Sequence, residues 1–396
     1  MTSAPAPPAS RTDRRLVGVD VARCLALLGM VATHVLDPRN AAGELTLAQS
    51  ISGGRASALF AVLAGLSLAL MTGRTTPLRG SERWARSAGI AVRALLIGGL
   101  GLWLGGLDTG IAVILTYYAL LFLLGIPFLG LRAPALAALA GVWLVAAPVV
   151  SHLVRPSLPD RTFNSPSFSR LDDPWPFLTE LTFTGYYPVV PWLAYLLAGM
   201  ALGRLDLTDR RVQALVAGAG GVLAATAVIV SRSLTAQPEL VTPLIGAGGP
   251  AARTGPELLD LIARGLYGTT PTGGAWEWLL VVAPHTGTPF DLAHTIGSAW
   301  LVIGVTLLVL GLLPAAGRRV VAVAFGAGAM TLSLYTLHVL MRTPDVPPAE
   351  EPDSFAVHVA VLLGIGAVYA LTRSRGPLER VVAWAASGVT RLARAA

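Results

Sequence analysis

Lysine is absent from this chain, and charge of either sign is scarce. All 29 basic residues are arginine, and charged residues make up only 13% of a sequence that is 54% hydrophobic. A soluble domain of this size would carry about twice that charged fraction. The low charge therefore argues against an ordinary soluble protein and predicts a multi-spanning membrane protein. The arginine-only basic set, with abundant Ala, Gly, Leu and Val, is typical of a GC-rich bacterial genome.

Other absences narrow the chemistry. The one cysteine, Cys24, excludes an intramolecular disulfide and is expected to be a small core residue. Cysteine or histidine pairs at zinc spacing are lacking, as is a glycine-rich phosphate loop, so we expect no metal. The net charge of +7 and the pI of about 10.1 come without a basic patch interleaved with aromatics. We therefore expect no nucleic-acid partner, and assign the basic residues to loops beside anionic lipid.

Apolar segments are the dominant feature that is present. A membrane-spanning helix needs about 20 mostly apolar residues. The sequence offers ten segments of about that length, at 17–36, 54–73, 86–105, 109–129, 133–153, 187–204, 212–231, 290–313, 319–341 and 355–372. This pattern predicts an all-α polytopic bundle of about ten transmembrane helices with the lipid bilayer as partner; a homodimer is left open.

The arginines orient this bundle. If the N-terminus is cytoplasmic, arginines concentrate in the inner loops and termini, at positions 11, 14, 15, 74, 79, 83, 86, 132, 204, 210, 211, 318, 319, 373, 375, 380, 391 and 394. That distribution follows the positive-inside rule. We therefore expect both termini in the cytoplasm of a bacterial plasma membrane protein. Residues 1–15 are expected to be a disordered tail, 16–373 the transmembrane domain, and 374–396 an amphipathic helix on the inner leaflet.

The first apolar segment contains VDVARCLALLGMVATHV, which carries residues unsuited to lipid. At 100° per residue, Asp20, Arg23, Met30 and His34 lie on one stripe, with Arg23 and His34 about 16 Å apart along the axis. Charge in a bilayer is costly, so this stripe should face a shared interior cavity that joins Arg23 to His34. Asp20 and Arg23 can pair across one turn, either beside a bound ligand or as an ion pair that fixes helix packing.

Histidines gather on the predicted outer side. His34, His152, His285, His294, His338 and His358 all fall there. Histidine exchanges protons near neutral pH, so this side is the expected place for general acid–base chemistry. We take His34 as the main catalytic candidate, with His285 in PHTGTPFD and His338 in LYTLHVL as further ones. Arg55, at the outer start of the second segment, is a candidate substrate-binding residue.

Two family resemblances follow from these residues. An Asp-x-x-Arg element with a histidine eleven residues after the arginine is similar to acyltransferase family 3 membrane proteins. Four stretches resemble more specifically the bacterial relatives of heparan-alpha-glucosaminide N-acetyltransferase. They are RLVGVDVARCLALLGMVATHV, GRASALFAVLAGLSLAL, YYPVVPWLAYLLAGMALGRLDL, and PHTGTPFDLAHTIGSAW followed by AMTLSLYTLHVL.

The resemblance implies a membrane acyltransferase. Such an enzyme uses cytosolic acetyl-CoA, or another acyl-CoA, and modifies a sugar on the far side, here an envelope glycan or glycolipid. In the acyltransferase family 3 pattern the first-span arginine and histidine are the essential pair, which here are Arg23 and His34. Because their charges lie toward the cytoplasm, Asp20, Arg23 and Arg93 are the expected donor contacts. Arg93 alternatively snorkels to the inner interface. The lysosomal enzyme of the family has asparagine where His34 stands, and its histidine lies in the following loop, which here has none.

The residues leave several alternatives open. His34 is either a general base or the carrier of an acyl group, and another outer histidine could supply the base instead. A transporter or exporter of a small solute or lipid would show similar intramembrane polar residues. A non-catalytic membrane partner of an envelope enzyme is a third interpretation. The acceptor and the acyl chain length are not predicted.

Overall fold

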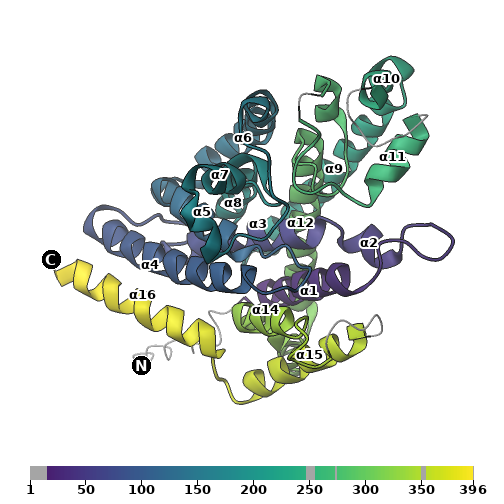
Figure 1. Ribbon diagram of the computed structural model, residues 1–396. Helices are drawn as coiled ribbons and strands as arrows, with labels where there is room; N and C mark the ends of the chain where they lie inside the picture. Colours follow the sequence, from purple (N-terminus) through teal and green to yellow (C-terminus); the bar gives the residue numbers. More distant parts are fainter. Residues whose placement is uncertain (1–15, 247–254, 273, 349–353, 396) are drawn as a thin grey trace, which may run out of the picture.

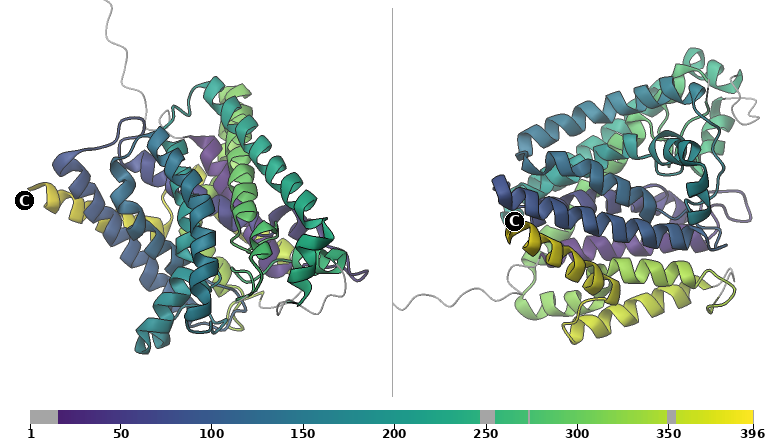
Figure 2. Two further views of the ribbon diagram at one scale, coloured as in Figure 1. Left: turned by 90° about the horizontal axis from the view of Figure 1, so that it is seen from above. Right: turned by 60° about the vertical axis from the view of Figure 1, so that its left-hand side comes forward.

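The computed structural model describes residues 16–246, 255–272, 274–348 and 354–395; the tail assigned to residues 1–15 lies outside them. Across these ranges the chain is helical and contains no strand, with Arg39 and Leu45 forming an isolated antiparallel bridge. Most of the long helices lie side by side in one bundle (Figures 1 and 2). The all-α prediction is confirmed.

The first half of the chain forms α1 (Val17–Val35), α2 (Leu47–Ser52), α3 (Arg55–Met71), α4 (Gly80–Gly105), α5 (Leu115–Gly125) with the 3₁₀ turn η1 (Ile126–Gly130), α6 (Ala133–Val154), η2 (Arg155–Ser157), η3 (Phe168–Asp172), α7 (Pro174–Thr179), the π-helical turn η4 (Glu180–Thr184) and α8 (Val189–Gly203). The second half forms α9 (Arg210–Thr235), α10 (Pro238–Gly246), α11 (Gly255–Ala263), η5 (Trp276–Leu280), α12 (Pro289–Leu312), α13 (Ala315–Ala324), η6 (Gly326–Ala329), α14 (Thr331–Leu340), α15 (Phe355–Leu371) and α16 (Pro377–Ala395).

Six helices among the described residues are long and apolar enough to cross a membrane. The helix pair that spans 174–203, bent by 50° at its break, makes a seventh if it counts as one span. Three shorter apolar helices, at 115–130, 331–340 and 355–371, fall in the remaining predicted segments. Length and composition thus support a multi-pass membrane protein and identify six or seven candidate spans among the described residues.

Small residues bring the central helices into close contact. A Cβ atom on Gly65 of α3 would collide with the α8 backbone at Leu196, and one on Gly199 of α8 would collide with the α3 backbone at Val62. Helices in lipid gain stability chiefly from such close packing, because lipid tails are as apolar as the side chains. On α1, Cys24 is fully buried, which confirms its expected role as a small core residue.

One predicted segment is broken. The single helix expected over 319–341 is two helices, α13 and α14, separated by the turn η6 and Met330. Two glycines in the turn explain the break, because they let its backbone approach its neighbours. A Cβ on Gly328 would collide with the carbonyl of Asp20 in α1, and one on Gly326 with that of Gly366 in α15. Non-helical backbone inside a membrane protein is tolerated where protein covers it or where it lines a cavity.

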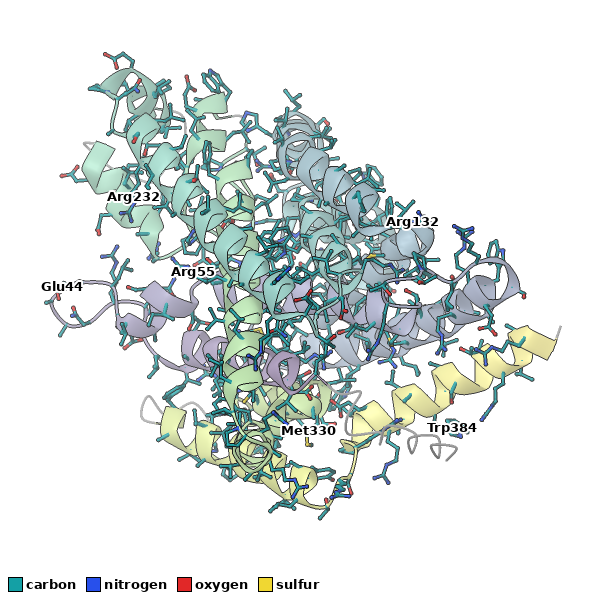
Figure 3. All side chains as sticks on the ribbon, turned by 180° about the vertical axis from the view of Figure 1, so that it is seen from behind. Glu44, Arg55, Arg132, Arg232, Met330 and Trp384 are labelled. Atoms are coloured by element: carbon teal, nitrogen blue, oxygen red, sulfur yellow. The ribbon has the colours of Figure 1, made fainter. Side chains whose placement is uncertain are left out.

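The C-terminal helix α16 packs along α4 (Figure 1). Gly89 of α4 touches Thr390 and the backbone of Ala386 at their crossing. The opposite side of α16 exposes Trp384, which is 73% accessible and is labelled in Figure 3. Val381 and Leu392 are exposed on the same helix, together with arginines 380, 391 and 394. A mixed apolar and cationic surface of this kind suits an anionic membrane interface.

Candidate active site

The predicted ion pair on α1 is present. Arg23 donates from Nη1 to the Asp20 carboxylate at 3.1 Å and from Nη2 to the hydroxyl of Ser67 at 2.6 Å. Asp20 is buried, and Ser67 belongs to α3. The pair therefore ties α1 to α3, as the packing interpretation requires. The same guanidinium also faces open space.

That space is two adjoining cavities. The first has a volume of about 520 Å³, and the second about 420 Å³. Five residues belong to both walls: Arg23, Leu70, Arg93, Ala329 and Glu379. Because they share these wall residues, the two cavities adjoin each other. We call the larger one the vestibule, the smaller one the apolar cavity, and the two together the chamber.

The vestibule is strongly cationic. Four arginines line it, Arg23, Arg74, Arg93 and Arg375, against the two carboxylates of Asp20 and Glu379. Guanidinium groups bind phosphate oxygens through paired, forked hydrogen bonds. The structure thus brings together all three of the predicted donor contacts, Asp20, Arg23 and Arg93. Arg74 and Arg375 were assigned from the sequence only to membrane topology.

Glu379 has a structural task at the same wall. Its carboxylate accepts hydrogen bonds from the backbone N–H groups of Leu332 and Ser333, at 2.8 and 3.1 Å, and from the Ser333 hydroxyl at 2.5 Å. It therefore caps the N-terminus of α14, where a negative charge is favourable. This cap fixes α16 to α14 at the chamber wall. Val382 and Ala383 of α16 also line the chamber.

The apolar cavity ends one helical turn below the histidines. On α1 its lining residues are Arg23 and Met30, but not His34; on α14 they reach Tyr335, but not His338. The hydroxyl of Tyr118 donates to the carbonyl of Ser57 at 3.1 Å, which fixes that ring in the wall. The expected continuous cavity from Arg23 to His34 is therefore seen only in part, because a layer of side chains that includes Met30 and Tyr335 closes its outer end.

Three histidines meet beyond that layer. Nδ1 of His34 lies 3.0 Å from Nε2 of His338, and Nδ1 of His338 lies 3.0 Å from Nδ1 of His358. His338 and His358 are fully buried, whereas His34 is only partly so. Of the predicted catalytic residues, His34 and His338 are thus in direct contact. His358, which sequence reasoning placed only on the outer side, completes the row.

His285 lies beside this row. It occupies a left-handed backbone conformation, with φ of 54°, in a loop held by the carboxylate of Asp291, which accepts from the N–H groups of Thr286 and Gly287 at 3.2 and 3.0 Å. Its ring packs on Tyr186 at 4.8 Å, and His34 is a near neighbour. Burial lowers the pKa of His285 to about 4, so the ring is neutral at pH 7.

Aromatic rings continue outward from His285. Tyr186 contacts Tyr267 at a ring separation of 5.9 Å, and Tyr267 contacts Phe163 at 5.7 Å. Arg161 lies over the Phe163 ring at 4.0 Å. Tyr267 and Phe163 are more than half exposed, so they offer an aromatic surface at the end of this series of rings.

Arg55 makes a different set of contacts. Its Nε donates to Nε2 of His294 at 2.9 Å, and its Nη1 donates to the carbonyl of Ser50 at 2.5 Å. Nδ1 of His294 lies 3.3 Å from the carbonyl of Ala224 in α9. Arg55, which is labelled in Figure 3, thus connects the start of α3 to α12 and, through His294, to α9. The structure thus joins this candidate to His294 and not to the row that contains His34.

Comparison with known families bears on this geometry. The catalytic region of heparan-alpha-glucosaminide N-acetyltransferase matches residues 15–236, more than half of the chain. The chain belongs to this family. Comparison with curated proteins gave no significant match. The match runs from α1 to the end of α9, so it contains Arg23, Arg93 and His34. His285, His338 and His358 lie outside it.

Proposed function

We propose that this protein is a membrane acetyltransferase that takes an acetyl group from cytosolic acetyl-CoA and transfers it to a sugar on the outer side. Membership of the heparan-alpha-glucosaminide N-acetyltransferase family supports the reaction class. The observation that carries the donor assignment is the chamber. Its cationic vestibule suits the phosphates of a nucleotide, and its narrower apolar part suits an uncharged arm and a short acyl group.

The proposed topology places these parts on the required sides. Ten spans with both termini in the cytoplasm put Arg23 and the vestibule inward and His34 outward. The arginine distribution supports this orientation. It can be tested directly, because Cys24 is the chain's only cysteine and is buried. A cysteine introduced as Ala42→Cys should react with an impermeant maleimide added outside cells, and one introduced as Thr208→Cys should not.

The transfer step requires one proton to move. The acceptor nitrogen or oxygen attacks the thioester carbonyl carbon, its new bond to carbon forms, and the carbon–sulfur bond breaks. His34 accepts the acceptor's proton and returns it to the departing thiolate, which leaves as free CoA thiol. General-base help of this kind supplies roughly 10²–10⁴ in rate. The alternative has two transfers: a His34 ring nitrogen attacks the thioester carbon and the carbon–sulfur bond breaks, and the acceptor then attacks the acetyl-imidazole and its carbon–nitrogen bond breaks.

The outer face supports a sugar as acceptor. The exposed rings of Phe163 and Tyr267 are of the kind on which the apolar face of a sugar packs, and they connect through Tyr186 to His285 beside His34. The layer at Met30 must open for the acetyl group to reach His34. Methionine has a flexible, unbranched side chain that adapts readily to such changes.

The test is thioester turnover by the purified protein in lipid nanodiscs. We expect release of free CoA thiol from acetyl-CoA that depends on an added amino sugar, with glucosamine as the probe. His34→Ala should lose roughly 10²-fold or more of this rate, whereas His152→Gln, which changes a histidine of α6, should not. Saturable solute flux without thiol release would instead favour a transporter.

A further inference from the structure

The row of three histidines has a geometry suited to hydrogen bonds in series. The ring planes of His34 and His338 differ by only 6°, and their centroids are 5.3 Å apart. With a nitrogen–nitrogen distance of 3.0 Å, that separation places the two rings edge to edge in a common plane. An imidazole N–H lies in its ring plane, so this bond is well aligned. The His338–His358 contact, at 3.0 Å, is twisted by 74° between ring planes.

The row also leaves each nitrogen a defined task. His338 uses both nitrogens, one toward each neighbour. His34 uses Nδ1, so only its Nε2 remains for a substrate. At the far end, Nε2 of His358 is buried and has no hydrogen-bond partner among the described residues. Within the row, Nε2 of His34 is therefore the nitrogen that remains for a substrate.

Neutral rings fix the protonation pattern. A neutral imidazole has one N–H donor and one acceptor nitrogen, so three rings carry three protons, and the two bonds each use one. The protons then all point from His34 toward His358, leaving Nε2 of His34 bare, or all point the opposite way, placing a proton on it. Arg342 is near enough for its positive charge to act on all three rings, which favours their neutral forms.

We propose that His338 and His358 are positioning residues that hold the proton of His34 on Nδ1 and leave its Nε2 unprotonated toward the acceptor. This inference rests on the proposed function in one respect, since a general base at His34 needs a bare Nε2. His34 Nδ1–H donates to His338 Nε2, and His338 Nδ1–H donates to His358 Nδ1. When His34 takes the acceptor's proton, the same bonds stabilise its charged form until the proton passes to the thiolate.

Paired substitutions separate this role from packing. His338→Met removes the acceptor for His34 at similar volume, whereas His338→Gln places an amide oxygen near the position of Nε2. His358→Leu and His358→Asn form the same comparison at Nδ1. We expect His338→Met to lose roughly 10²-fold in kcat, within the range of general-base catalysis, with KM for acetyl-CoA unchanged. His338→Gln and His358→Asn should recover much of the activity, and His152→Gln should match the wild type.

The tautomer can be observed without turnover. In protein labelled with ¹⁵N-histidine, solid-state NMR distinguishes protonated from unprotonated ring nitrogens, and the His34 signals are identified by their loss in His34→Ala. We expect protonated Nδ1 and unprotonated Nε2 in the wild type, with this pattern lost in His338→Met and kept in His338→Gln. A protonated Nε2 in the wild type would overturn the inference, as would full activity of His338→Met. Wild-type protein that shows the expected tautomer but releases no thiol would refute the proposed function alone.

Discussion

Arg204 gives the sharpest test of how the donor side is held together. It caps α8 and is only 3% exposed, and its guanidinium makes six hydrogen bonds. Five go to backbone carbonyls and the sixth to the Thr72 hydroxyl; the carbonyls belong to residues 69, 72, 74, 129 and 131. These carbonyls lie in the last turns of α3 and η1 or just after them, where a helix leaves carbonyl groups without a full set of intrahelical partners. Burial lowers the pKa of Arg204 to about 10, so it stays charged at pH 7.

Replacing Arg204 with methionine should cost about 3–5 kcal/mol. A net hydrogen bond contributes roughly 0.5–1.5 kcal/mol, and six of them at the lower end of that range, with imperfect additivity, give this figure. Breaking a buried charged group's contacts has a cost of the same order. Lysine offers three donors, so Arg204→Lys should retain up to half of the bonds and lose about 2 kcal/mol.

The assay is thermal unfolding in one detergent, followed by tryptophan fluorescence. The expected order of Tm is wild type, Arg204→Lys, then Arg204→Met, with Arg391→Met as a control on the exposed side of α16. Arg204 also holds the carbonyl of Arg74, whose φ is 54° and whose side chain lines the vestibule. We therefore expect a raised KM for acetyl-CoA in Arg204→Lys. Wild-type melting of the methionine variant would refute the argument.

Three further predictions concern the chamber and the outer loop. The pKa of His285 is about 4 in the folded protein against an ordinary value of 6.5, so the unfolded chain binds the proton first as the pH falls. The free energy of unfolding is therefore highest above pH 6.5 and decreases between pH 6.5 and 4. His285→Gln should remove at most roughly 3 kcal/mol of that decrease, which is followed as the change in Tm between pH 7 and 5. Met30→Phe should stiffen the layer that closes the apolar cavity and lower kcat with little change in KM for acetyl-CoA, and an unaffected kcat would contradict a passage at this point. Arg74→Lys should preserve insertion but raise KM for the donor, because a compact ammonium loses the forked contact; equal KM for the lysine variant and the wild type would exclude Arg74 from donor binding.

Much of the fold follows from local pattern. Each of the ten apolar segments predicted from the sequence contains a helix, because hydrophobicity over about 20 residues is a property of neighbours in the chain. The break at Gly326–Met330 could not be predicted in the same way. Its cause is the close approach of η6 to Asp20 and Gly366, which lie far away in the sequence. Hydropathy gives the length of the apolar segment 319–341 but contains no information about contacts between distant residues.

In the candidate site, too, local features could be predicted from the sequence and long-range contacts could not. The stripe of Asp20, Arg23 and His34 was accessible from helical periodicity alone, and the predicted Asp20–Arg23 pair is present. The contact between His34 and His338 joins residues 304 positions apart, which no periodicity indicates. The sequence indicated only that all six histidines lie on the predicted outer side. It could not show that His358, and not His294, contacts His338. Arg375 and Glu379 were not predicted as site residues, because the basic C-terminal helix was already explained by binding to the membrane surface.

The part of the chain that matches the acetyltransferase family does not complete the site by itself. It supplies α1, and with it Arg23 and His34, but the wall beside α1 comes from η6 and α14, and Glu379 of α16 fixes that wall. A Cβ on Gly328 would push this wall away from α1 at the level of Asp20. The hydrogen-bond partner of His34 is also on α14. The continuous segment of η6 and α14 thus meets α1 twice, at Gly328 beside the chamber and at His338 beside His34. We therefore expect a change in the packing of this segment on α1 to alter the chamber and the orientation of His34 together.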